Sequence, residues 1–144
     1  KDQFLANSRL GVMEIVCPPH ADFTDEKLQS WLHKVIEESL RRNAKSILPS
    51  RLAFLSKQCG LSYSSVKINS SSGRWGSCSA RGNINLSYFL VLLPKHLIDY
   101  VLLHELAHTR EMNHGERFWA LLDGMTDGKA QLLRSELRKY RTDF

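Results

Sequence analysis

The chain has 144 residues, which fits one domain of ordinary size and permits a hydrophobic core without disulfide or metal staples. Hydrophobic residues make up 42% and charged residues 24%, which excludes an intrinsically disordered chain, and no apolar run approaches the ~20 residues of a transmembrane helix. Three widely spaced cysteines without a Cys-x-x-Cys pair argue against a disulfide framework and favour a reducing cytoplasm. We therefore expect one domain over residues 1–144 and no membrane span. The chain starts with lysine, which leaves room for a missing upstream segment.

Positive charge gathers in two places along the sequence. The net charge is +5, which makes nucleic acid or another polyanion a partner to consider. Neither cluster is interleaved with aromatic residues as base-stacking sites are, so we interpret both as solvated helix faces. The clusters are Arg41, Arg42 and Lys45, and then Arg134, Arg138, Lys139 and Arg141.

The first half of the chain predicts two helices between two strands. A short strand starts at Gly11 and is ended by two prolines. Thr24 is the expected N-cap of a helix with one apolar face, which closes before a second short helix from about Ser50 to Gln58. Gly60 suits the C-cap of that second helix. The alternating stretch 63–70 predicts the next strand.

The middle of the chain predicts a turn-rich segment and a further strand. Residues 70–82 hold three of the eight glycines and predict turns. Residues 83–92 predict a strand with Ile84 and Leu86 on one face.

The last third of the chain predicts helices. Pro94 marks the start of a helix that we expect to reach His108 or slightly beyond. Further helices are expected from about Glu116 and from Lys129. Helices, then strands, then helices predict an α+β fold and not an alternating βαβ fold.

Residues 104–114, with the sequence HELAHTREMNH, hold three of the six histidines. Residues four apart lie about 40° apart on a helix, so His104 and His108 can bind one Zn²⁺ together. Glu105 then lies beside the metal, where a general base takes a proton from metal-bound water. The sequence therefore predicts a catalytic zinc site built on a helix.

A catalytic zinc site needs a third protein ligand, and His114 is the best candidate. A continuous helix would point His114 some 120° away, so the helix must end between Thr109 and Asn113. Asparagine tolerates left-handed conformations, which makes Asn113 a plausible bend. The rival third ligands are Glu111, Glu116 and Glu136.

The alternative interpretation of this stretch is a helix that carries surface histidines. His104 and His108 lie close to the apolar residues Val101, Leu102 and Leu106, which suits free solvent-facing side chains poorly. We therefore favour the metal site.

The sequence resembles the YgjP-like metallopeptidase domain family, which is related to the WLM and SprT-like zinc proteins. The resemblance rests on RWGSCSARGNINLSYFLVLLP at 74–94 and IDYVLLHELAHTREMNHGERFW at 98–119. It implies a compact zincin-like domain: a small twisted sheet packed on helices, with the His-Glu-x-x-His motif on the active-site helix. It also implies His114 as the third zinc ligand.

The resemblance further implies that the strand around Asn83 to Ser87 edges the cleft, so Asn83 and Asn85 are candidate substrate-binding residues. The chain departs from the family at Ser87, where many members have asparagine. Glu111 stands where metzincins have glycine, so the chain is not interpreted as a metzincin.

Arg74 lies in the glycine-rich turn and is a candidate for polarising substrate or binding an anion, the alternative being a purely structural turn. Trp75 is expected in the core. Cys78 is expected to be a small buried residue and not a nucleophile. The remaining expectations are packing behind His114 for Phe118 and Trp119, weak support of the metal site for Asp99 and Tyr100, and unpartnered surface positions for His20, His33 and His96.

Three functions remain open on the sequence. The favoured one is a zinc-dependent hydrolase, a metallopeptidase acting on a peptide or protein with Glu105 as general base. The second is a metal-dependent phosphohydrolase acting on a nucleotide at the same site, although the chain lacks a Walker loop. The third is a nucleic-acid-binding module that uses the basic helices.

Overall fold

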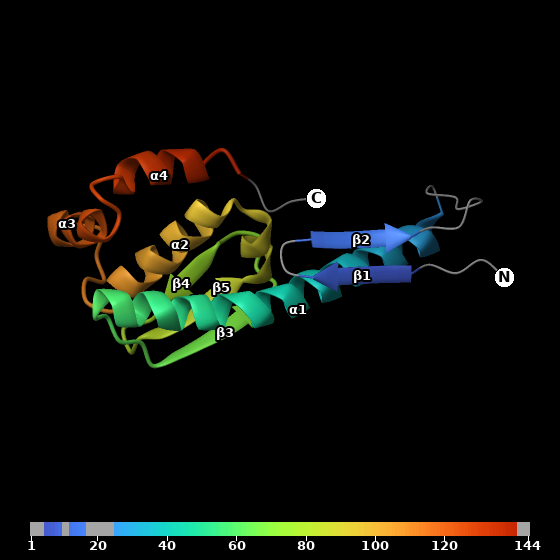
Figure 1. Ribbon diagram of the computed structural model, residues 1–144, viewed down its shortest axis with the longest axis horizontal. Coiled ribbons are helices and arrows are strands. Elements are labelled where there is room, and N and C mark those ends of the chain that lie inside the picture. The colour runs from blue at the N-terminus through green and yellow to red at the C-terminus, as the bar shows by residue number, and fades with distance from the viewer. Residues whose placement is uncertain (1–4, 10–11, 17–24, 141–144) are drawn as a thin grey trace.

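The computed structural model describes residues 5–9, 12–16 and 25–140 of the chain. It confirms the expected α+β class, with a small sheet packed on helices (Figure 1). The elements are β1 (Leu5–Arg9), β2 (Val12–Val16), α1 (Glu26–Cys59), β3 (Ser65–Asn69), β4 (Gly76–Cys78), β5 (Asn83–Ser87), the 3-10 helix η1 (Tyr88–Leu92), α2 (Lys95–Ala107), α3 (Glu116–Met125) and α4 (Ala130–Leu137).

The long helix α1 organises the arrangement of the other elements. Its first part lies beside the β1–β2 hairpin, and its second part packs against η1, α2 and β3 (Figure 1). The helix α2 packs between this layer and the pair α3 and α4, which lie at one end of the molecule (Figure 1). The predicted strand from Gly11 is confirmed by β2, while the two prolines that were to end it lie outside the described residues.

The three-stranded sheet has the order β3-β5-β4, with β3 parallel and β4 antiparallel to the central strand β5. The strand that was expected to edge the cleft, Asn83–Ser87, is therefore the central strand of this sheet, and β4 lies at the sheet edge next to it. The strand β4 was expected to be turn. It has three residues, too few for an alternating pattern to show in the sequence.

The expected strand over 83–92 ends early, at Ser87, and continues as η1. The Ser87 hydroxyl accepts a hydrogen bond from the Phe89 amide at 3.2 Å and donates one to the Ser71 carbonyl at 2.7 Å. These bonds turn the chain, because a serine side chain at a helix start satisfies an amide that has no partner within the helix. Ile84 and Leu86 are fully buried on one face of β5, as predicted.

The expectation of two helices between Thr24 and Gln58 is wrong, since α1 runs through Pro49 without a break. Leu48 and Leu52 are fully buried on either side of Pro49, so burial of one apolar stripe outweighs the cost of the proline. The N-cap is Asp25, whose carboxylate accepts from the Lys27 amide at 2.8 Å, and not Thr24, which lies outside the described residues.

The end of α1 is as predicted, because Gly60 caps it with a left-handed φ of 69°. Among the described residues, no helix combines the length and apolar character that crossing a membrane requires.

Candidate metal centre

The helix α2 positions the first part of the site. It starts after Pro94, as predicted, and ends at Ala107, with His108 as its C-cap. The fully buried Leu102 and Leu106 anchor the helix in the core and fix the direction of the intervening residues. His104 and Glu105 lie on its last turn.

A tight turn after α2 brings the chain back toward the helix. The amides of Arg110 and Glu111 donate to the Ala107 carbonyl at 3.1 and 2.9 Å, and the Thr109 hydroxyl donates to the Leu106 carbonyl at 2.6 Å. The helix thus ends slightly before the expected interval 109–113. Among the described residues only Asp127 is a non-glycine with positive φ, so Asn113 does not bend the chain through the expected left-handed conformation.

This turn brings three imidazoles together. The Nε2 atom of His114 lies 3.0 Å from Nε2 of His108 and 3.3 Å from Nε2 of His104. One ligand nitrogen from each of the three histidines lies within 4.8 Å of the others, so the group could hold a metal ion.

The donor atoms and spacing fit a zinc ion. Two nitrogens at 2.0–2.1 Å from a tetrahedral Zn²⁺ lie about 3.3–3.4 Å apart, close to the two Nε2 separations of 3.0 and 3.3 Å. Three histidines leave a fourth position open, which is the arrangement of catalytic zinc sites.

The protonation states of the imidazoles also suit metal binding. Burial, reinforced by the neighbouring His108 and His114, lowers the pKa of His104 to about 3. Burial likewise lowers the pKa of His108. Nδ1 of His108 lies 3.1 Å from the Glu111 carbonyl, which can only accept, so Nδ1 carries the proton and Nε2 keeps a free lone pair toward the other two rings.

An aromatic layer from α3 supports the three imidazoles. Phe118 is fully buried, and its ring stacks on His108 with centroids 4.5 Å apart. It also meets the rings of His104 and His114 edge-on at 4.9 and 4.8 Å. The ring centroid of Trp119 lies 6.2 Å from that of His114. The predicted packing role of Phe118 and Trp119 behind His114 is confirmed.

Glu105 is 5% exposed and faces β4. Burial raises the pKa of its carboxyl to about 7, against a smaller lowering effect of the Arg74 guanidinium. A methyl group added at Gly76 would lie 3.2 Å from Cγ of Glu105 and 3.2 Å from the Asn85 carbonyl oxygen. Only glycine at this position lets the β4 backbone approach the carboxylate so closely.

Two cavities border the three histidines. One, of about 320 Å³, reaches His104, His108 and His114. The other, of about 330 Å³, extends from His104 toward α4. Arg74 and Glu105 line both cavities. The Arg74 side chain therefore borders the space in which it was predicted to contact a substrate.

The other candidate substrate residues lie apart from these cavities. Neither Asn83 nor Asn85 lines either of them. The Asn83 side chain instead accepts a hydrogen bond from the Ser65 hydroxyl at 2.9 Å. Both asparagines lie on the central strand β5. The neighbouring edge strand β4, and not β5, lines the histidine cavity.

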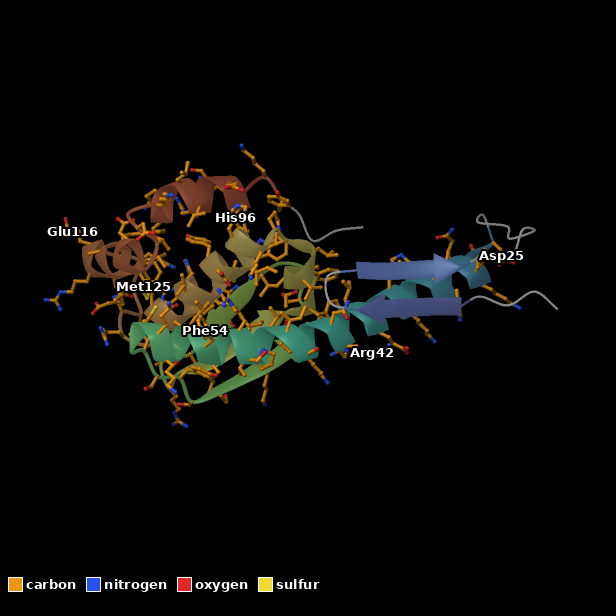
Figure 2. All side chains as sticks on the ribbon, viewed as in Figure 1. Asp25, Arg42, Phe54, His96, Glu116 and Met125 are labelled. Carbon is orange, nitrogen blue, oxygen red and sulfur yellow. The ribbon has the colours of Figure 1, made fainter. Side chains whose placement is uncertain are left out.

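The rival third ligands have other surroundings. Glu136 on α4 accepts a hydrogen bond at 2.6 Å from His96 on α2, which is labelled in Figure 2, so the expectation of an unpartnered His96 is wrong. Glu116 is exposed in the first turn of α3, and Glu111 meets His108 through its backbone carbonyl. None of the three shares the described metal-binding group.

Two further expectations are settled by contacts. Asp99 forms a bidentate ion pair with Arg51 of α1 at 2.8 Å, which agrees with the expectation that it supports the metal site only weakly. Cys78 lines the histidine cavity, and burial raises the pKa of its thiol to about 11. Such a thiol is protonated at neutral pH, which agrees with the expectation that it is not a nucleophile.

The sequence did not predict that residues near the C-terminus line the second cavity. Arg134 and Arg138 were interpreted as part of a solvated helix face, but they line this cavity together with Tyr100 and Trp75. Trp75 also packs against the core, as predicted. The spacing of four between the two arginines predicts a shared helix face, but the sequence does not reveal that this face borders on His104.

Comparison with known protein families gives a match over most of the chain. The sequence model of the family described as "YgjP-like, metallopeptidase domain" matches residues 3–140. No curated protein matches the chain.

Two solved structures share the fold. A metallopeptidase zymogen, abylysin of Pyrococcus abyssi, is 21% identical with a TM-score of 0.58, covering 65% of this chain and 93% of that chain. A second, jannalysin of Methanocaldococcus jannaschii, is 18% identical with a TM-score of 0.55, covering 63% and 93%. The expected zincin-like fold is thereby confirmed.

Proposed function

The chain belongs to the YgjP-like metallopeptidase domain family, and on this premise we propose that it is a zinc-dependent peptidase with Glu105 as its general base. The family makes the chain a hydrolase, and the three-histidine group is where a metal cofactor could bind. The observation that carries the proposal is the convergence of the three Nε2 atoms beside the buried carboxyl of Glu105.

We propose that His104, His108 and His114 hold a Zn²⁺ ion. Bound zinc supplies Lewis-acid chemistry, since it polarises a carbonyl and lowers the pKa of water. The chain supplies the position: Phe118 fixes the imidazole rings, and the Glu111 carbonyl fixes the tautomer of His108.

Glu105 is suited to move a proton. Its pKa, raised to about 7 by burial, lies near neutral pH, where a general base works best. In the proposed reaction its carboxylate takes a proton from the attacking water and delivers it to the leaving amine. The nearby positive charge of a bound metal shifts this pKa downward, toward the ionised form that accepts a proton.

The strand β4 favours a peptide as substrate. It is one of the two edge strands of the three-stranded sheet, and Gly76, Ser77 and Cys78 line the histidine cavity. Unpaired backbone groups at a sheet edge can bind an extended peptide as an added strand. A peptide on this edge would pass directly beside Glu105.

A second candidate is hydrolysis of a nucleotide phosphoanhydride on the same site. The observation in its favour is the set of Arg74, Arg134 and Arg138 around the second cavity, because guanidinium groups also bind phosphate.

We also propose a reducing compartment, the cytoplasm. Within the described part of the chain, Cys59 and Cys78 are free thiols. Structural disulfides are rare in reducing compartments, where such thiols persist.

The proposal is tested by incubating zinc-loaded protein with a library of internally quenched peptides and, in parallel, with nucleoside triphosphates. We expect peptide cleavage, and we expect Glu105→Gln to bind zinc normally but to lose at least about 10²-fold in kcat. Phosphate release without peptide cleavage would support the second candidate instead. Retained peptide cleavage by pure, zinc-loaded Glu105→Gln would remove Glu105 from the role of base.

A further inference from the structure

The second cavity carries unbalanced positive charge. It lies between the turn before β4, α2 and α4, and has a volume of about 330 Å³. Three guanidinium groups, those of Arg74, Arg134 and Arg138, line it, and Glu105 is the one carboxylate among its described lining residues. A lining of this composition attracts an anionic group.

Arg134 on α4 and Arg138 at its C-cap have no carboxylate partner within the described part of the chain. The ion pairs there join Arg51 to Asp99 and His96 to Glu136. Glu136 lies on α4 between the two arginines, yet its carboxylate is held by His96 of α2. The positive charges of Arg134 and Arg138 therefore remain available to a ligand.

Arg134 is held close to the metal centre. Its guanidinium carbon lies 5.6 Å from the centroid of the Trp119 ring, a cation–π contact. The same ring lies 6.4 Å from that of His104 and 6.2 Å from that of His114. An anion bound by Arg134 would therefore lie next to the reaction site and not on a remote surface.

Tyr100 supplies a second, independent indication of a ligand. It lines the same cavity, is 2% exposed, and its ring lies 5.9 Å from that of His104, one helical turn along α2. Its buried hydroxyl has no hydrogen-bond partner within the described part of the chain. Because a buried hydroxyl without a partner has lost its hydrogen bonds to water, an oxygen atom from a ligand would restore a hydrogen bond there.

We propose that this cavity is a specificity subsite for a carboxylate group of the peptide substrate, held by Arg134 and Arg138 and by a hydrogen bond from the Tyr100 hydroxyl. This inference rests on the proposed peptidase function. The carboxylate can be the free C-terminus of the substrate or the side chain of an aspartate or glutamate near the scissile bond.

The lining favours a carboxylate over a triphosphate. Enzymes bind nucleoside triphosphates with Mg²⁺, which is held by protein carboxylates, but the two described cavities share a single carboxylate, Glu105. The β4 edge beside the cavity also suits a peptide backbone. A guanidinium group binds a planar carboxylate through two parallel hydrogen bonds.

The test compares kcat/KM for matched quenched peptides cleaved by zinc-loaded protein. One pair differs only in a free or an amidated C-terminus, and a second series moves one Glu or Gln through the three positions on each side of the scissile bond. We expect at least about tenfold higher kcat/KM for one class of carboxylate-bearing peptide. A preference confined to the free terminus identifies a C-terminal subsite, and one confined to Glu identifies a side-chain subsite.

Variants assign that preference to the cavity. The double variant Arg134→Gln/Arg138→Gln should reduce the ratio of acidic to neutral kcat/KM to near one, mainly through KM. Tyr100→Phe should lower the ratio and keep the packing of the ring. Arg117→Gln removes the same charge from an exposed position on α3 outside both cavities, and it should leave the ratio unchanged.

A binding measurement separates this inference from the proposed function. Acid and amide forms of one peptide are titrated into Glu105→Gln, and the fluorescence of Trp75 and Trp119 beside the cavity reports binding. We expect tighter binding of the acid form, abolished in the double arginine variant. If no peptide is cleaved, the proposed function fails while this measurement still decides on the subsite.

Three results would overturn the subsite. The first is equal cleavage and equal binding of acidic and neutral peptides by the wild-type protein. The second is an acidic preference that survives the double arginine variant. The third is competition by a nucleoside triphosphate without any discrimination by carboxylate.

Discussion

The absence of a side chain at Gly76 determines how closely β4 approaches the reacting carboxylate of Glu105. Gly76 lets the β4 backbone lie against Cγ of Glu105, and the carbonyl of Asn85 in the neighbouring strand limits the same space. Burial of the Glu105 carboxyl, to which this close packing contributes, raises its pKa to about 7. One glycine thus links sheet packing to the acid–base chemistry of the site.

Gly76→Ala should therefore lower both the stability of the protein and its catalytic rate. The new Cβ at 3.2 Å from Glu105 and Asn85 forces a shift, which we expect to destabilise the protein by about 1–3 kcal/mol and to lower kcat. Chemical denaturation and peptide kinetics measure the two effects. Gly124→Ala is the control: it has open space around it in α3 and should be neutral or stabilising by about 0.5–1 kcal/mol. Equal behaviour of the two variants would contradict the account.

The pKa of Glu105 predicts a pH-dependent stability in metal-free protein. The folded-state pKa of about 7 lies above the ordinary 4.5, so this residue's contribution to stability is fully present below pH 4.5 and is lost as the pH rises through 7. Glutamine does not titrate. We therefore expect metal-free Glu105→Gln to gain stability relative to metal-free wild type as the pH rises from 4.5 to 8, by about 3 kcal/mol.

Urea denaturation of both metal-free proteins at several pH values measures this difference. The lowered pKa values of His104 and His108 act on both proteins alike, so their effects cancel in the comparison. A difference that stays constant between pH 4.5 and 8 would show that Glu105 titrates normally.

At the scale of elements, α1 shows how packing overrides a local signal. A proline inside a helix removes one hydrogen bond and crowds the carbonyl four residues earlier, here that of Lys45. The buried stripe of Leu40, Ala44, Leu48 and Leu52 nevertheless continues past Pro49 at a spacing of four. The helix forms because its buried face extends over both halves.

Pro49→Ala should consequently stabilise the protein by up to about 3 kcal/mol, since it restores the missing hydrogen bond in a helix that is already continuous. Thermal and urea unfolding measure the change. Ser46→Ala, at an exposed position of the same helix, is the matched control and should change stability by no more than about 0.5 kcal/mol. A loss of stability in Pro49→Ala would mean that a bend at the proline is required by the fold.

The site could be predicted from the sequence only where its geometry is local. The spacing of His104 and His108 on one helix and the buried faces of β5 and α2 follow from periodicity within each element. The sequence predicts that the chain must bend before His114. It does not predict the conformation of the bend, because that conformation arises from backbone hydrogen bonds to Ala107.

The remaining features depend on contacts between distant elements. Arg134 and Arg138 border the site only because α4 packs on α2. The strand β4 is defined by its pairing with β5. Asp99 forms an ion pair with Arg51, which lies on a helix much earlier in the chain. Periodicity along the sequence contains no information about these partners.

At the scale of the whole molecule, the proposed centre joins the C-terminal end of α2, the following turn and the aromatic layer of α3. His114 is the member that depends on this assembly, because it lies outside any helix and rests against Phe118. The central claim is therefore that the third ligand is His114 and not a glutamate.

The most direct test is the zinc content of purified, zinc-loaded wild-type protein and of four variants, measured after dialysis by elemental analysis. We predict one zinc per wild-type chain and its near-complete loss in His114→Ala, because two protein ligands are too few for a tight catalytic site. Glu111→Ala, Glu116→Ala and Glu136→Ala should keep the wild-type zinc content. Stoichiometric zinc in folded His114→Ala, together with loss of zinc from one glutamate variant, would contradict the three-histidine centre.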